Sequence, residues 1–333
     1  MTYPRTLLLL SLFVSSTALA APTITSVTPN RGPLEGGTRV TIKGTGFSNN
    51  CNICSPPFAA PFVTFGAVRA AEVKFIDANT LEAVTPPSLP RTVFVDVSNG
   101  GASGYTFMEN AFTFEGNVDD TFEPILFPVF LPPVHGQLGS EFRTFPRVFS
   151  VVQASPAVLY GFDSTCYLVD PPIYPFMPYL VDEERMLLTG CSHATGRIFW
   201  MRKGTAGSLA AGLRVADISR EATSHGTEIP VVRTRDFTTG RIVLLGVPTD
   251  PRFRLTLRIY SLAQTSEPVN VEGLGRQVFF TPGRDLYEPS YAEVSDLPRT
   301  LTRVVIQSSG APVWAFITVT NNDTQQITTI SPQ

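Results

Sequence analysis

Prolines interrupt this sequence so often that long helices have little room in it. The chain contains 29 prolines among 333 residues, well above the usual share of about 5%. A proline in a helix interior removes a backbone hydrogen bond and breaks the helix. Since 43% of the residues are hydrophobic and only 16% are charged, the chain is also too apolar for disorder. These features predict an all-β fold of short strands, and the length predicts two or three domains.

The N-terminus has the pattern of a cleaved export signal. Arg5 precedes an apolar run at residues 6–14, and an Ala-Leu-Ala ending at Ala20 fits a signal-peptidase site. The run is far shorter than the ~20 residues of a membrane anchor, which is the alternative. We therefore expect residues 1–20 to be removed and the mature chain to be secreted, periplasmic or displayed on the cell surface, with no membrane span.

The four cysteines are expected in disulfides, because exported proteins with an even number of cysteines commonly form them. Cys51 and Cys54 form a C-x-x-C in a loop-like sequence. A zinc site would need two further ligands, and a redox pair would normally open a helix, for which no signal follows. We favour a structural disulfide over both alternatives, which leaves Cys166 and Cys191 to pair with each other.

The opening of the mature sequence alternates strand and turn signals. Gly36 and Gly37 supply the positive φ that a chain reversal needs. Val40 and Ile42 then alternate with polar residues, which is the period of a half-buried strand. Two further glycines predict a tight bend before Phe47, and we expect the Phe47 ring in the core.

This order of strands and turns resembles the IPT/TIG domain, an immunoglobulin-like β-sandwich. The resemblance continues through segments 63–66, 81–87, 93–101 and 112–114, which are similar to its later strands. An insertion at 48–61, which holds the C-x-x-C, is the one departure. The resemblance implies an immunoglobulin-like domain at residues 21–116 that binds or spaces and does not catalyse. With a net charge of −3 and scattered basic residues, nucleic acid is excluded as its partner.

Residues 117–333 are strand-like almost throughout. We place a polar joint at Asn117–Asp120 and expect two further β-sandwich domains, at 117–226 and 227–333. A weak repeat supports this division, because each half carries an acid-Phe-x-Thr motif and closes with a tryptophan-bearing hairpin, at 198–218 and at 313–330. The end of the chain resembles C-terminal regions of exported bacterial proteins that carry a TIG domain, and this resemblance implies no activity.

The clearest strand pattern lies at residues 252–260. Phenylalanine, leucine and isoleucine alternate there with Arg252, Arg254, Thr256 and Arg258, so apolar and polar residues lie on opposite faces. The arginines would suit an anionic glycan. Because the chain is acidic overall, an ordinary solvated face is favoured.

No motif for catalysis or metal binding is present: the sequence lacks H-E-x-x-H, G-x-S-x-G, S-x-x-K and EF-hand spacings. His135, His193 and His225 lie in turn-like sequence, where an exposed histidine is favoured over a catalytic base. Adjacent carboxylates at 182–184 seldom oppose each other across a sugar, so a solvated turn is favoured there. We assign no catalytic residue, no metal ligand and no cofactor.

An aromatic segment at residues 171–179 is the candidate contact site. Tyr174, Phe176 and Tyr179 lie there among prolines, which exclude a central strand and predict a loop. Rings on a stiff surface loop suit stacking on a sugar or on a protein partner. The competing arrangement, in which the rings cover the sandwich core, is the commoner one for apolar loop residues.

We interpret the chain as an exported, non-catalytic, multi-domain binding or adhesion protein whose partner is a glycan or a surface protein. The alternative is a glycan-active hydrolase in which the TIG domain is a spacer. A pocket with two carboxylates about 5–10 Å apart favours the hydrolase, and a sandwich without a cleft favours the binding protein.

A bond between Cys166 and Cys191 would tie the base of the aromatic loop, so that its rings need not be ordered on binding. We predict that replacing Tyr174 and Phe176 by Ala abolishes partner binding and leaves the melting temperature nearly unchanged. A large fall in melting temperature would show that the rings belong to the core. The pairing itself requires Cα atoms within about 7 Å of each other.

Overall fold

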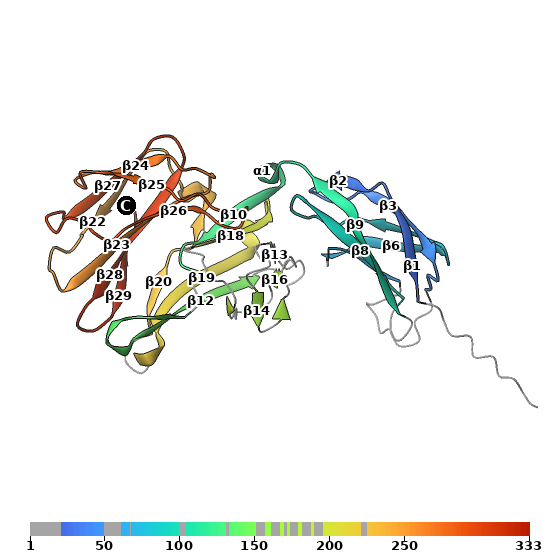
Figure 1. Ribbon diagram of the computed structural model, residues 1–333, viewed down its shortest axis with the longest axis horizontal. Coiled ribbons are helices and arrows are strands. Elements are labelled where there is room, and N and C mark those ends of the chain that lie inside the picture. Colours follow the sequence, from blue (N-terminus) through green and yellow to red (C-terminus); the bar gives the residue numbers. More distant parts are fainter. Residues whose placement is uncertain are drawn as a thin grey trace, which may run out of the picture. The chain divides into compact units, whose positions relative to one another are not determined.

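The computed structural model describes residues 21–49, 61–66, 68–99, 104–130, 133–150, 157–160, 167–169, 172–173, 179–181, 188–189, 196–220 and 225–333. Strands dominate these residues, which confirms the expected all-β class. The helices among them are single turns: α1 (Val118–Thr121), η2 (Gln137–Gly139), η3 (Ala206–Ser208), η4 (Ile218–Arg220) and η5 (Thr234–Asp236). The chain divides into two compact units, Met1–Glu115 and Gly116–Gln333 (Figure 1).

The first unit contains two β-sheets. One sheet has the order β1 (Thr23–Thr28), β3 (Arg39–Thr45), β7 (Thr80–Val84), β6 (Glu72–Asp77). The other has the order β2 (Arg31–Pro33), β9 (Tyr105–Glu115), β8 (Arg91–Ser98), β4 (Phe62–Phe65), β5 (Val68–Arg69). All neighbouring strands are antiparallel except β2 and β9, which are parallel.

The glycine pattern at the start of this unit has the expected effect. Gly36 and Gly37 adopt φ values of 74° and 79°, so the predicted reversal is confirmed. Val40 and Ile42 are fully buried, and Phe47 is buried as well. The side chain of buried Asn99 accepts a hydrogen bond from the Ser48 amide, and its Nδ2 donates to the backbone of the preceding bend. These contacts fix the chain where it leaves β3.

The polar joint after the first unit is a single helical turn. Asn117 caps α1, and its Oδ1 accepts a hydrogen bond from the Asp119 amide at 3.3 Å. Asparagine at the cap and carboxylates in the first turn favour a helix start, because both interact with unpaired amides. Composition alone predicts only a polar segment here.

The first part of the second unit contains two larger sheets. One has the order β18 (Arg197–Arg202), β10 (Phe122–Phe127), β21 (Val232–Arg233). The other has the order β11 (Val134–His135), β12 (Glu141–Ser150), β19 (Leu209–Asp217), β20 (Thr227–Ile229). Consecutive residues Ile125, Leu126 and Phe127 are fully buried, so both faces of β10 are covered. Short strands pair nearby: β13 (Ala157–Leu159) with β16 (Tyr179–Val181), and β14 (Tyr167–Val169) with β15 (Pro172–Ile173) and β17 (Leu188–Thr189).

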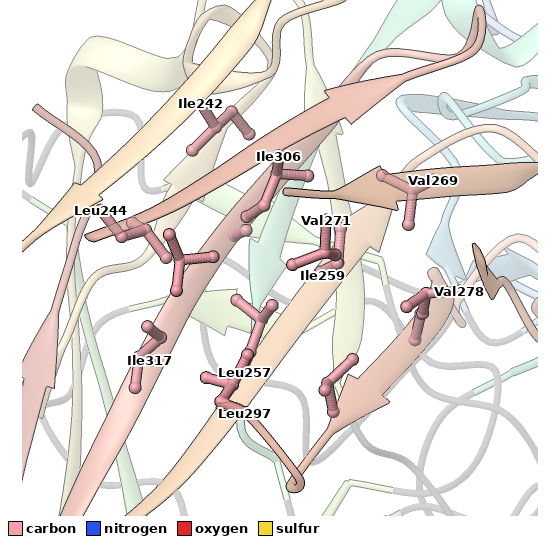
Figure 2. Close-up of a cluster of buried hydrophobic side chains, with 14 of the residues drawn as sticks. Ile242, Leu244, Leu257, Ile259, Val269, Val271, Val278, Leu297, Ile306 and Ile317 are labelled. Carbon is pink, nitrogen blue, oxygen red and sulfur yellow. The ribbon is translucent and has the colours of Figure 1, made fainter. Parts of the chain in front are cut away.

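The rest of the second unit is a sandwich with an apolar core (Figure 2). One sheet has the order β22 (Arg241–Leu245), β27 (Arg303–Ser308), β24 (Pro268–Val271), β25 (Gln277–Phe279). The other has the order β26 (Ser290–Val294), β23 (Phe253–Ser261), β28 (Val313–Asn321), β29 (Ile327–Ile330). Leu255, Leu257 and Ile259 of β23 are buried in this core, which confirms the apolar face predicted from alternation.

Of the two predicted tryptophan hairpins, one is confirmed. β28 and β29 form the predicted hairpin, and Asn321 Oδ1 accepts the amides of Asp323 and Thr324. The residue of this turn with a left-handed backbone is Gln325, with a φ of 59°. The hairpin at 198–218 is wrong, because β18 pairs with β10 whereas β19 pairs with β12 and β20. The chain between β18 and β19 therefore passes from one sheet to the other.

Strands on one side of the predicted domain boundary at residue 226 are hydrogen-bonded to strands on the other side. β20 and β21 follow that position in the chain, yet they pair with β19 and β10, which precede it. The two acid-Phe-x-Thr motifs that support the repeat also differ in secondary structure. Glu141 begins strand β12, whereas Asp236 ends the helical turn η5. The division of residues 117–333 into two domains stays a prediction.

We predict that a fragment of residues 21–116 folds alone, because the first unit has its own core. It should show a β-type circular dichroism spectrum and one cooperative melting transition. A fragment that stays unfolded under oxidising conditions would contradict the boundary and the self-sufficiency of the domain.

Candidate functional site

Most residues of the sequence-predicted contact site lie outside the described residues. This applies to Tyr174, Phe176 and to the cysteines at 51, 54, 166 and 191. Tyr179 begins the short strand β16, where it is paired with Leu159. In the expected loop, two residues, Pro172 and Ile173, form β15 at the edge of its sheet, a position that proline tolerates. The loop's role as a contact surface therefore stays a prediction.

The histidines do not mark a reactive site. The side chain of His135 is exposed, as expected, but it lies in the short strand β11 and not in a turn. His225 is exposed outside any strand, and its carbonyl oxygen accepts a hydrogen bond from Arg214. His193 lies outside the described residues. Within the part of the chain that the structure describes, no group of three or more His, Cys, Asp or Glu side chains is placed to hold a metal ion.

A cleft of about 900 Å³ in the second unit is the candidate ligand site. One wall comes from α1, β10 and β18 and includes Phe122, Glu123 and Trp200. The other wall comes from the segment after β23 and two later loops, and includes Gln264, Leu286 and Pro312. We call this the Trp200 cleft. Ligand sites in proteins usually measure about 300–1,000 Å³ and combine apolar walls with a few polar groups.

The indole of Trp200 connects the two walls. Its Nε1 donates a hydrogen bond to the Leu286 carbonyl at 2.7 Å. The nearby Ile198 amide donates to the Tyr287 carbonyl at 2.8 Å, which is a second hydrogen bond between the walls. Within the first wall, Lys203 N donates to the Thr121 carbonyl at 2.9 Å. The walls are therefore joined by main-chain and side-chain hydrogen bonds, and the cleft is preformed.

A residue that lines the Trp200 cleft has a buried carboxylate oxygen with no hydrogen-bond partner among the described residues. This atom is Oε1 of Glu123. Burial lowers the pKa of the Arg233 guanidinium, and the negative charge of Glu123 acts in the opposite direction. An unpaired buried acceptor is costly, so a native protein that keeps one commonly has a use for it.

Sequence reasoning missed both Trp200 and Glu123 as site residues. The cleft gathers residues between Val118 and Pro312, so no local spacing marks it. One signal was available: Glu123 is the single charged residue in the apolar run 122–130, at a position where an apolar residue would be expected.

The fold of the first unit is that of an immunoglobulin-like sandwich. Residues 22–114 match the family model of the IPT/TIG domain, so the chain contains such a domain there. No curated protein matches the chain. Among the residues that the structure describes, no helix is long and apolar enough to cross a membrane.

We predict that Trp200→Phe lowers the free energy of unfolding by about 1–3 kcal/mol more than Trp314→Phe does, since it leaves the carbonyl of half-buried Leu286 without its donor. Trp314 is a matched control, because the two tryptophans are 6% and 5% exposed and the Trp314 indole makes no hydrogen bond within the described chain. Urea unfolding of both variants measures the difference. Equal losses would show that the Trp200–Leu286 bond does not hold the walls together.

Proposed function

We propose that this protein is an exported, non-catalytic binding or adhesion protein whose ligand occupies the Trp200 cleft. The ligand is a glycan or a segment of a surface protein. The pattern at residues 1–20 supports export. The IPT/TIG domain is an immunoglobulin-like fold often used in binding or adhesion, which supports the general class.

The unpaired Oε1 of Glu123 is the observation that carries this proposal. A ligand O–H or N–H that donates to this oxygen would satisfy it, and a buried bond to a charged acceptor is stronger than a neutral one. Apolar walls around Trp200 and Phe122 would cover the rest of the ligand. Glycans and peptides both present donors beside apolar surface, so both fit this chemistry.

The hydrolase alternative has one observation in its favour, since Asp119 and Glu123 both line the Trp200 cleft. They come, however, from consecutive elements of one wall, α1 and β10. The residues of the other wall include no carboxylate among those described. A glycosidase needs its two carboxylates on opposite sides of the scissile bond. This arrangement favours binding without cleavage.

The test is a glycan-array screen of the chain from Ala21 onward, followed by titration of each hit against Glu123→Met. This variant keeps the length of the side chain and removes the acceptor. We expect the dissociation constant to rise about tenfold or more, the loss of one charge-assisted hydrogen bond. The melting temperature should change little, because no hydrogen bond to that oxygen is lost and only the attraction between Glu123 and half-buried Arg233 is removed.

Lys74→Met is the matched control, because Lys74 is an exposed residue of β6 in the first unit. It should bind as the unmodified chain does. Unchanged affinity in Glu123→Met would overturn the assignment of the cleft. Release of shortened products from a bound glycan would overturn the non-catalytic class and support the hydrolase.

A further inference from the structure

A second cleft in the second unit lies against the arginine face of β23. It encloses about 200 Å³ between the sheet that contains β23 and β28 and the sheet that contains β12 and β19. It shares no lining residue with the Trp200 cleft. The expectation that this face of β23 is an ordinary solvated surface is therefore wrong, since Arg254, Thr256 and Arg258 are only partly exposed and line a cleft. We call it the arginine cleft.

Positive charge dominates the lining of the arginine cleft. Arg143, Arg254 and Arg258 line it, and no carboxylate does so among the described residues. Two of these arginines have acidic neighbours: Arg143 contacts Glu141 at 3.2 Å, and Arg258 forms an ion pair with Glu293 at 3.5 Å. The Arg254 guanidinium has no hydrogen bond or ion pair within the described chain. Its charge is the one left for a ligand.

Hydroxyl groups lie beside the arginines on the same sheet face. Thr256 is directly opposite Thr318, and Arg254 is directly opposite Thr320 in the β23–β28 register. Arg258 Nη1 donates to Thr318 Oγ1 at 2.6 Å, which fixes this arginine along the wall. The Thr318 hydroxyl itself donates to the Thr256 carbonyl at 3.4 Å. The Arg254 guanidinium and the hydroxyls of Thr256 and Thr320 lie on the same sheet face, and such donors suit an anion with several acceptor oxygens.

The facing wall of the arginine cleft is largely apolar, and its polar side chains are Arg143 and Thr144 of β12. Val134, Phe142, Val215 and Ile229 come from β11, β12, β19 and β20 respectively. A hydrogen bond from Thr227 Oγ1 to the Ile327 carbonyl connects β20 to β29, and therefore joins the two walls. A free inorganic anion would leave this apolar surface uncovered. A ligand with both a charged group and an apolar body would cover both walls.

We propose that the arginine cleft binds a small organic carboxylate whose apolar body packs on the facing wall. The fork of an arginine matches a carboxylate with two parallel hydrogen bonds. The volume sets the size, because a dry cavity of about 150 Å³ accommodates benzene, and this cleft is somewhat larger. The inference does not rest on the function proposed for the Trp200 cleft.

Calorimetric titration of the full chain tests the proposal with phenylacetate and hexanoate as probes. Each probe is paired with its neutral amide, which has nearly the same shape. Acetate is the control for a carboxylate that lacks the larger apolar group. We expect at least one of the two carboxylates to bind about tenfold or more tightly than both its amide and acetate. Added salt should weaken that binding.

Arg254→Gln removes the unpaired charge and should lower the carboxylate affinity about tenfold with little change in melting temperature. Arg303→Gln is the matched control, because Arg303 is an exposed arginine of β27 in the other sheet of the sandwich. It should bind as the unmodified chain does. The proposal is overturned if neither carboxylate binds better than its amide, if acetate binds equally well, or if Arg254→Gln binds as tightly as the control.

Discussion

The buried hydroxyl of Tyr260 joins the two chain segments on which both clefts depend. Tyr260 is fully buried, and its hydroxyl donates a hydrogen bond to the carbonyl oxygen of Pro128. Burial raises the pKa of Tyr260 well above its usual value, so the hydroxyl keeps its proton and remains a donor. Its ring also stacks with that of Phe316, with 6.4 Å between the centroids. Strand β23 is held in this way against β28 and against the end of β10.

Residues of these two segments, on either side of the hydrogen bond between Tyr260 and Pro128, line both clefts. The β10 segment supplies Phe122 to the Trp200 cleft and, directly after Pro128, Val129 to the arginine cleft. Strand β23 supplies arginines to one cleft, and Leu262 just beyond its end lines the other. A movement of β23 relative to β10 would change the walls of both clefts. The two clefts therefore share one structural support.

The sequence correctly predicts features that depend on residues close to each other in the chain. The hairpin of β28 and β29 has a turn that Asn321 closes with its own side chain, and alternation along β23 shows which face is buried. The pairing expected for β18 and β19 fails because each strand selects a partner far away in the chain, β10 and β12. Local patterns carry no information on such partners, and the Trp200 cleft depends on the same long-range pairing.

Strands β20 and β21 also limit where this chain can be divided or fused to another protein. They complete sheets whose other strands precede residue 226, so a chain that ends there lacks two edge strands. The amide and carbonyl groups of β19 and β10 would then lie open to other chains, and exposed edges of this kind promote aggregation. Gene fusion or domain exchange at residue 226 would therefore yield an assembly-prone fragment. Exchange at Gly116, between the two compact units, leaves every described sheet whole.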